Sequence, residues 1–419
     1  MFDPATPSGV RRLPGTRETV ALLAGLMALN AFAIDAMIPA LPAIGRELGV
    51  ADENRRQLVV VAYFFGFGAT QLIWGPLADR FGRKPVLAAG VLLYTLFAVF
   101  CGIANSFTLL IASRVAMGAS AAVTRVLVVA MVRDLFEAED MARVMSLVFM
   151  VFMLVPVLAP NIGQAILLVA SWRAIFLILA AYALIMLAWS SWRLPETLHP
   201  EYRRTLAWRE MTSAIVQTVR EPLSRGYTLA LAVTFGALIA YISSIQQIVF
   251  DAFDDERYIG LVFAAVAAPM ALASYTNSRV VGRFGLRRVG HSAAAGFALI
   301  TALHATLAVA GQETLWLFIV LQSLAMCSFA FASSNLSTLA MEHMAPIAGT
   351  ASSVQGVVGT TGGALIGFGI GQAFDGTATP FLIGSALCGT IGFLIVLLTE
   401  PKRLFARIER REPVSENLG

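Results

Sequence analysis

Asp35 lies deep within the first of several long apolar segments, and it is the only acid so placed in the first half of the chain. A charge at the centre of a bilayer costs roughly 2.5–3.5 kcal/mol on insertion scales, so a buried acid needs a compensating role. A carboxyl group in a partly dry cavity holds a proton more readily than one in water. We therefore expect Asp35 to carry a proton or to contact a substrate. The alternative is an acid that is permanently paired with an arginine.

Arg114 is the expected partner of Asp35. Asp35 lies about nine residues from the outer end of its segment and Arg114 about seven from the outer end of its own, so both lie roughly 10–13 Å below the outer surface. Tyr63 has a similar depth in another segment. We expect the three to form one polar cluster, in which substrate binding weakens the ion pair and raises the affinity of Asp35 for a proton. A static salt bridge between two helices is the alternative.

Arg125 follows Arg114 by eleven residues, close to three helical turns, so the two arginines share one helix face with small residues such as Gly118. This pattern favours a cavity wall. Snorkelling towards the inner surface, or a pair with an acid such as Asp134, is an equal alternative.

Two other features concern helix geometry. Pro156, Pro160 and Gly163 follow one another within a single apolar segment, and each proline removes a backbone hydrogen bond, so the sequence predicts a bent helix that approaches its neighbours closely. His304 is a lone ionisable residue in its segment, and we expect a structural histidine rather than a member of a proton relay.

The elements that must position these residues are membrane-spanning helices. Of the 419 residues 58% are hydrophobic and only 13% are charged, and the mean hydropathy is +0.76. A soluble domain usually carries about a quarter charged residues. Apolar blocks of about 20 residues, long enough to cross a hydrocarbon layer of roughly 30 Å, recur along the whole chain. The twelve blocks lie near 20–44, 57–78, 85–104, 107–132, 143–168, 173–192, 226–250, 258–280, 289–310, 313–341, 351–373 and 379–399.

Basic residues predict the orientation in the membrane. Arg80, Lys84, Arg133 and the arginines of 193–225 fall on the side that also holds both termini, and Arg46 and Arg173 are among the few on the other side. Because Lys and Arg in short loops resist translocation, both termini are expected in the cytoplasm, in a multi-pass inner-membrane protein without a cleaved signal. The net charge of +4 then indicates contact with anionic lipid and no nucleic acid.

The segment 193–225 divides the chain. We predict a cytoplasmic N-terminal segment (1–19), a six-helix bundle (20–192), a cytoplasmic linker with an amphipathic helix (193–225), a second six-helix bundle (226–399) and a cytoplasmic tail (400–419). Arg80, Phe81 and Gly82 recur 203 residues later as Arg283, Phe284 and Gly285. The fold class is therefore an all-α polytopic membrane protein with two pseudo-symmetric bundles.

Duplicated bundles place a substrate site between them, near the middle of the membrane. Polar side chains gather in some segments, whereas four segments are almost wholly apolar and are expected to face lipid. The polar residues expected to line the cavity are Asn30, Tyr63, Gln71, Arg125, Asn161, Gln246, Gln322, Asn335 and Gln355, although some of these could simply join helices. Cys101, Cys327 and Cys388 lie inside apolar segments and indicate neither a disulfide nor a metal site, and no cofactor is expected.

The run Gly-Pro-Leu-Ala-Asp-Arg-Phe-Gly-Arg-Lys-Pro from Gly75 to Pro85 resembles the cytoplasmic signature of the major facilitator superfamily. The residues from Asp35 to Pro42, Arg114 with Gly118, and the segments 156–163, 172–176 and 194–197 resemble the Bcr/CflA branch of drug/proton antiporters. The resemblance implies export of antibiotics of the bicyclomycin or chloramphenicol type in exchange for protons, with Asp35 as the coupling group. It also implies a cytoplasmic gate made by Gly75, Asp79, Arg80, Gly82, Arg83, Lys84 and Arg133, in which Asp79 binds Arg133 and the start of the segment 351–373.

The sequence thus predicts proton-coupled efflux of a small lipophilic or amphiphilic substrate by a protein that is not an enzyme and acts as a monomer in the lipid bilayer. A proton-coupled metabolite exporter or an uptake symporter on the same fold is the first alternative. A membrane-embedded sensor or enzyme is a distant one, because we find no intramembrane metal cluster and no nucleophile motif.

Overall fold

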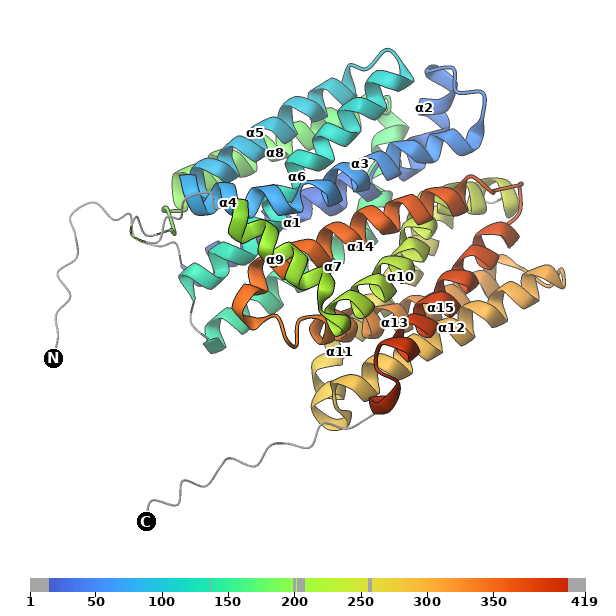
Figure 1. The fold of residues 1–419 in the computed structure, drawn as a ribbon. Helices are drawn as coiled ribbons and strands as arrows, with labels where there is room; N and C mark the ends of the chain where they lie inside the picture. The colour runs from blue at the N-terminus through green and yellow to red at the C-terminus, as the bar shows by residue number, and fades with distance from the viewer. Residues whose placement is uncertain (1–14, 137, 199–200, 202–207, 255–257, 406–419) are drawn as a thin grey trace.

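The computed structural model describes residues 15–136, 138–198, 201, 208–254 and 258–405. In this part of the chain the regular elements are helices, and no strand occurs. The helices run alongside one another in two groups, and the first described helix begins on the same side as the last one ends (Figure 1). This arrangement agrees with the predicted fold class.

The first half contains eight α-helices. They are α1 (Thr16–Asp35), α2 (Leu41–Glu47), α3 (Leu58–Ala69), α4 (Gln71–Phe81), α5 (Arg83–Gly102), α6 (Phe107–Leu135), α7 (Ala138–Val169) and α8 (Arg173–Arg193). Two 3-10 turns, η1 (Ile38–Ala40) and η2 (Glu53–Gln57), precede α2 and α3.

The second half begins with α9 (Trp208–Arg220), which lies within the predicted amphipathic linker. It continues with α10 (Pro222–Gln247), the π-helical turn η4 (Ile248–Ala252), α11 (Ile259–Phe284), α12 (Leu286–Val309), α13 (Leu315–Ala340), η6 (Ala345–Ile347), α14 (Ala348–Gly371), α15 (Thr379–Thr399) and η7 (Pro401–Arg403). Residues 199–200 and 202–207 of the predicted linker lie outside the described residues.

Each of the twelve predicted segments coincides with a helix or a pair of helices. Among the described residues, ten helical stretches are long and apolar enough to cross a membrane, and the stretches Glu53–Ala69 and Gln71–Phe81 form an eleventh span bent by 45°. The 32-residue helix α7 occupies the position of the remaining segment.

Two predicted single helices are in fact broken. The first segment is interrupted between Asp35 and Leu41, where Pro39 cannot donate a backbone hydrogen bond and disfavours helical geometry at the residue before it. The second is bent at Thr70, whose hydroxyl donates hydrogen bonds to the carbonyls of Gly66 and Ala119. Hydrophobicity alone could not predict these breaks.

The internal repeat has a conformational basis. Gly82 and Gly285 adopt φ values of 102° and 90°, in the region that favours glycine, and each ends one helix and begins the next. The repeated Arg-Phe-Gly sequence therefore makes the same chain reversal in both halves.

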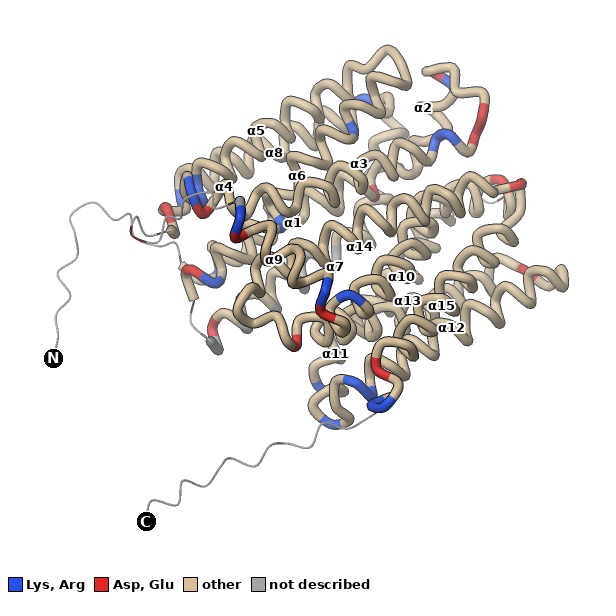
Figure 2. Tube along the Cα trace, viewed as in Figure 1, with Lys and Arg blue, Asp and Glu red and all other residues tan. Residues whose placement is uncertain are grey.

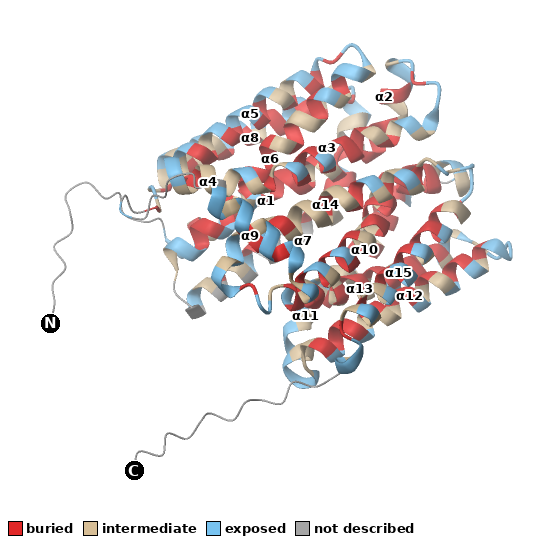
Figure 3. Cartoon of the chain, in the orientation of Figure 1, coloured by how far each residue is buried: buried red, intermediate tan, exposed pale blue. Residues whose placement is uncertain are grey.

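The two ends of the bundle differ in charge. Lys and Arg gather where α4 ends, where α12 begins and along α9 (Figure 2), and we call this the basic end. The opposite end, which carries η2 and the connection between α14 and α15, is called the far end. Buried residues concentrate where the helices face one another, and exposed residues lie on the outer faces (Figure 3). Large apolar side chains such as Leu92, Leu299 and Leu398 are among the exposed ones. An apolar exterior of this kind suits contact with lipid.

The two halves meet mainly through two helix pairs, α3 with α14 and α7 with α11. η1 of the first half also contacts α10 of the second half. The broken first span therefore lies beside the boundary between the halves.

Candidate functional site

Asp35 is the last residue of α1 and is only 4% exposed. Its carboxylate belongs to none of the ion pairs shorter than 4 Å in the part of the chain that the structure describes. The carboxyl-terminal end of a helix carries a partial negative charge, which disfavours an ionised carboxylate there. Burial and this helix end together make the site suited to holding a proton.

Gly163 of α7 packs against the backbone of Ala36, the residue that follows Asp35. A Cβ atom at position 163 would lie 1.8 Å from the carbonyl oxygen of Ala36, so only glycine permits this approach. Pro156 and Pro160 lie in the same helix, which stays continuous across both. The predicted close approach of this helix to a neighbour is present at Gly163. The sequence did not indicate that the neighbour would be the residue after Asp35.

Arg114 does not pair with Asp35, contrary to the prediction. Its guanidinium is fully buried and donates to the carbonyl oxygen of Val59 at 2.7 Å and to that of Ala33 at 3.0 Å. Because α1 ends at Asp35, the Ala33 carbonyl is one of the last four in the helix, which have no N–H donor from a following turn. Arg114 therefore caps the C-terminal end of α1 by donating a hydrogen bond to the Ala33 carbonyl.

Tyr63 joins Arg114, as predicted from their shared depth. The guanidinium carbon lies 4.6 Å from the centroid of the Tyr63 ring, and the Tyr63 hydroxyl donates to Asn30 Oδ1 at 3.0 Å. Asn30 Nδ2 in turn donates to Thr124 Oγ1 at 2.7 Å. Two members of the expected three-residue cluster thus meet, and this chain of contacts links α1, α3 and α6.

Arg125 is exposed, and its guanidinium carbon lies 6.0 Å from the ring centroid of Phe67. Asp134, a predicted alternative partner, instead binds Arg83 at 3.1 Å and accepts a hydrogen bond from Thr197. The small residue Gly118, expected on the cavity wall, packs against the backbone of α3 at Tyr63.

The remaining residues predicted to line the cavity differ in the partners that they contact. Gln71 donates to Thr360 across the halves, and Asn161 lies against Gly260 of α11. Asn335 and Gln355 bind Asn277 and Ser337 and join helices within the second half. Gln246 Oε1 and Gln322 Nε2 are enclosed without a hydrogen-bond partner.

A network of carboxamides joins the halves at the far end. Asn54 Nδ2 donates to the carbonyl oxygens of Gln372 at 3.2 Å and Phe374 at 2.9 Å, and Gln372 Nε2 donates to the Asn54 carbonyl at 2.9 Å. Gln247 Nε2 donates to Asn54 Oδ1 at 2.9 Å. Gln57 donates to Gln247 and to the Gly371 carbonyl. The sequence analysis did not single out this network, because its members are far apart in the chain.

At the basic end, the motif residues stay within the first half. Arg83 binds Asp79 at 2.6 Å and Asp134 at 3.1 Å, and its backbone N–H donates to Glu196 at 2.8 Å. The pair of Asp79 with Arg133 that the resemblance implied does not occur among the described ion pairs. Gly349, near the start of α14, has open space around it.

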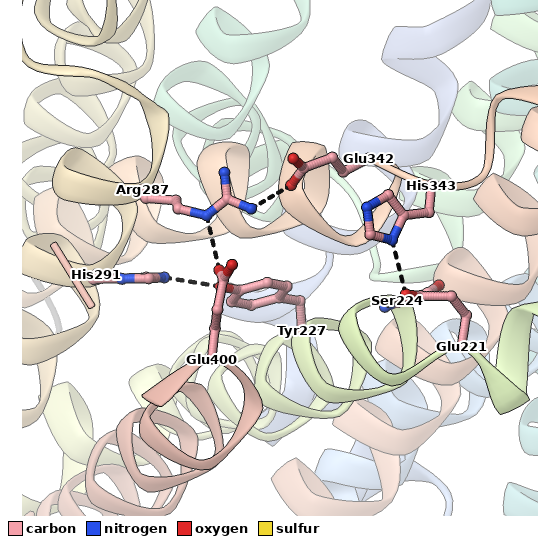
Figure 4. A network of polar contacts seen from close by, with 8 residues as sticks. All are labelled: Glu221, Ser224, Tyr227, Arg287, His291, Glu342, His343 and Glu400. Atoms are coloured by element: carbon pink, nitrogen blue, oxygen red, sulfur yellow. Dashed lines mark hydrogen bonds and ion pairs between the residues drawn. The ribbon is translucent and has the colours of Figure 1, made fainter. Parts of the chain in front are cut away.

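The second half repeats this charge arrangement (Figure 4). Arg287, near the start of α12, binds Glu342 at 2.6 Å and Glu400 at 2.8 Å, and Glu400 also accepts a hydrogen bond from Tyr227. Burial raises the pKa of Glu400, but the hydrogen bonds from Arg287 and Tyr227 outweigh it, so the pKa lies below its ordinary value. Glu400 therefore stays charged and links α10, through Tyr227, to α12, through Arg287.

His304 Nε2 lies 3.0 Å from Glu313 Oε1, near the far end of α12. This contact gives the histidine a partner within its own half, as a structural role requires.

The geometry defines a multi-pass α-helical membrane protein built from two similar halves, with a buried acid where they meet. The family model "Major Facilitator Superfamily" matches residues 23–368, and the chain belongs to this family. Its fold is therefore that of a transporter family.

Curated relatives cover nearly the whole chain. The chain is 30% identical to the "Bicyclomycin resistance protein homolog" of Haemophilus influenzae over 397 residues, which cover 91% of this chain and 96% of that protein. It is 27% identical to the "Multidrug resistance protein MdtL" of Escherichia coli, over 92% of this chain and 96% of the relative.

Solved structures support the fold. The xylose transporter XylE of E. coli, in a partially occluded inward-open conformation, superposes with a TM-score of 0.72 at 12% identity and covers 92% of this chain and 99% of its own. The human organic anion transporter MFSD10 gives 0.67 at 17% identity, covering 92% of this chain and 100% of its own.

Proposed function

We propose that this protein exports small lipophilic or amphiphilic molecules in exchange for protons, with Asp35 as the proton carrier. The observation that carries the proposal is the buried, unpaired carboxyl at the broken end of α1, beside the boundary between the halves. The names of the relatives, which refer to bicyclomycin and multidrug resistance, support drug-like substrates.

The cycle follows from alternating access. A proton from the outside binds Asp35 when the far end is open, and it leaves to the cytoplasm after the far end has closed and the basic end has opened. The carboxamide network at the far end supports this order, because it joins the halves there through six hydrogen bonds. One charge moving through 100 mV supplies about 2.3 kcal/mol, which supports a substantial concentration ratio.

The proposed setting is the cytoplasmic membrane, with both termini in the cytoplasm and the chain acting as a monomer. The gathering of Lys and Arg at the end where α1 begins and α15 ends supports this orientation (Figure 2). No nucleic acid takes part in this scheme.

Flux measurements on purified protein test the proposal. Proteoliposomes are given an imposed pH gradient, and a panel that includes chloramphenicol and bicyclomycin is followed. Net movement of a compound against the direction of proton flow supports antiport. Movement of the compound in the same direction as the protons would show symport and contradict antiport. Flux that does not respond to the pH gradient would refute proton coupling.

A further inference from the structure

Tyr241 of α10 has a hydroxyl group that makes no hydrogen bond. The side chain is 3% exposed and packs against the rings of Phe263 at 5.7 Å and Phe381 at 6.4 Å between centroids. Its hydroxyl oxygen is fully enclosed and without a partner. An enclosed hydroxyl without a partner destabilises the protein, and such a group in a native structure needs an explanation.

Tyr241 faces the region of Asp35 across the boundary between the halves. Ile38 of η1, three residues after Asp35, belongs to the same apolar cluster as Tyr241, although it comes from the other half. η1, which begins three residues after Asp35, is in contact with α10, the helix that carries Tyr241. The elements that carry the two groups are therefore neighbours, and no hydrogen bond joins the groups in this conformation.

Other titratable groups packed against α1 make hydrogen bonds, although Nη2 of the Arg114 guanidinium has no partner. Arg114 of α6 binds the carbonyls of Val59 and Ala33. The Tyr182 hydroxyl of α8 donates to the Gly25 carbonyl at 2.9 Å, and the Tyr94 hydroxyl of α5 donates to the Leu29 carbonyl at 3.4 Å.

α7 contacts α1 and η1, and at Ala36, the residue after Asp35, its closest approach is made by Gly163, which carries no side chain. Arg114 Nη2 and the Tyr241 hydroxyl are thus both enclosed donors without a partner, and the Tyr241 hydroxyl is the one that comes from the second half.

We propose that Tyr241 is a positioning residue for the proton of Asp35. When α1 and α10 approach during the cycle, the Tyr241 hydroxyl donates a hydrogen bond to the deprotonated carboxylate, and this bond breaks when Asp35 takes up a proton from water. Tyr241 keeps its own proton throughout. The hydrogen bond would make the protonation state of Asp35, in the first half, depend on the position of the second half. This inference rests on the proposed function, in which Asp35 carries the proton.

Infrared titration of the purified protein tests this inference without requiring a substrate. The C=O band of the protonated Asp35 carboxyl is assigned by its loss in Asp35→Asn and followed against pH. A hydrogen bond to the ionised form favours that form, so the Tyr241→Phe variant should deprotonate only at higher pH. We expect its midpoint to rise by about one pH unit. Incorporation of 3-fluorotyrosine at position 241, which makes a stronger donor of nearly the same size, should lower the midpoint.

Tyr182→Phe is the matched control, because it removes a hydroxyl that binds α1 away from Asp35. Its midpoint should equal that of the natural protein. An unchanged midpoint in both position-241 variants, or an equal shift in the control, would overturn the role of Tyr241 and leave the proposed function standing. A spectrum without any Asp35 band would overturn both.

Discussion

At the scale of single residues, Arg114 shows what depth along a helix can and cannot predict. Arg114, Tyr63 and Asp35 were expected at one level, and Arg114 and Tyr63 do meet. Depth fixes one coordinate but not the direction in which a side chain leaves its helix. The arginine turns instead towards the Ala33 carbonyl, which the break after α1 leaves available.

Arg114→Ala should lower stability without moving the pH dependence of Asp35. The variant leaves the carbonyls of Val59 and Ala33 without their buried donor, at a cost of about 1–3 kcal/mol for each unsatisfied group. Thermal unfolding in detergent should show a clear loss, while the Asp35 infrared midpoint stays in place. A large shift of that midpoint with unchanged stability would restore the ion pair predicted from the sequence.

Gly163→Ala should separate α7 from the end of α1. The added methyl group would overlap the Ala36 carbonyl, and backbone atoms cannot move aside as a flexible side chain can. Overpacking typically costs about 1–3 kcal/mol. If this cost falls on the conformation in which α7 and α1 are in contact, transport should drop roughly tenfold or more. Gly369→Ala, in α14, is the control, because a methyl group there meets nothing within 4 Å. Equal activity of the two variants would show that the contact has no functional importance.

At the scale of elements, the far end and the basic end play different parts. The far end carries uncharged carboxamide contacts between the halves, whereas the ion pairs around Arg83 and Arg287 stay within one half each. Carboxamides do not titrate, so closure of the far end should not itself depend on pH.

Asn54→Ala should favour opening of the far end. It removes the three hydrogen bonds that the Asn54 side chain makes, each worth about 0.5–1.5 kcal/mol net. A cysteine placed at Ser244, a small buried residue one turn before Gln247, should then react faster with a membrane-impermeant thiol reagent from that side. Asn277→Ala, which breaks contacts inside the second half only, should not have this effect. Unchanged labelling in Asn54→Ala would contradict the role of the network.

At the scale of the whole molecule, the number and order of the segments could be predicted, because each needs about 20 apolar residues to cross the membrane. The repeat of Arg80 to Gly82 also predicted the two similar halves. The breaks at Ala36 and Thr70 depend on local backbone geometry, which hydrophobicity does not record. The far-end network brings together Asn54 and Gln372, whose pairing depends on how the two bundles associate.

Several site predictions remain predictions. Asp35 lies where the proposal needs it, buried beside the boundary between the halves. Asn335 and Gln355 join neighbouring helices, and whether they also contact a substrate depends on the opening of the basic end. The gate implied for Asp79 and Arg133 likewise stays a prediction, and in this structure Asp79 binds Arg83.

The measurement that tests the central claim most directly is proton release on substrate binding. Purified protein in a weakly buffered solution is mixed with chloramphenicol, and the pH of the solution is recorded. The natural protein should release close to one proton for each bound molecule, whereas Asp35→Asn, folded and still able to bind, should release none. Equal release by the two proteins would show that Asp35 is not the proton carrier.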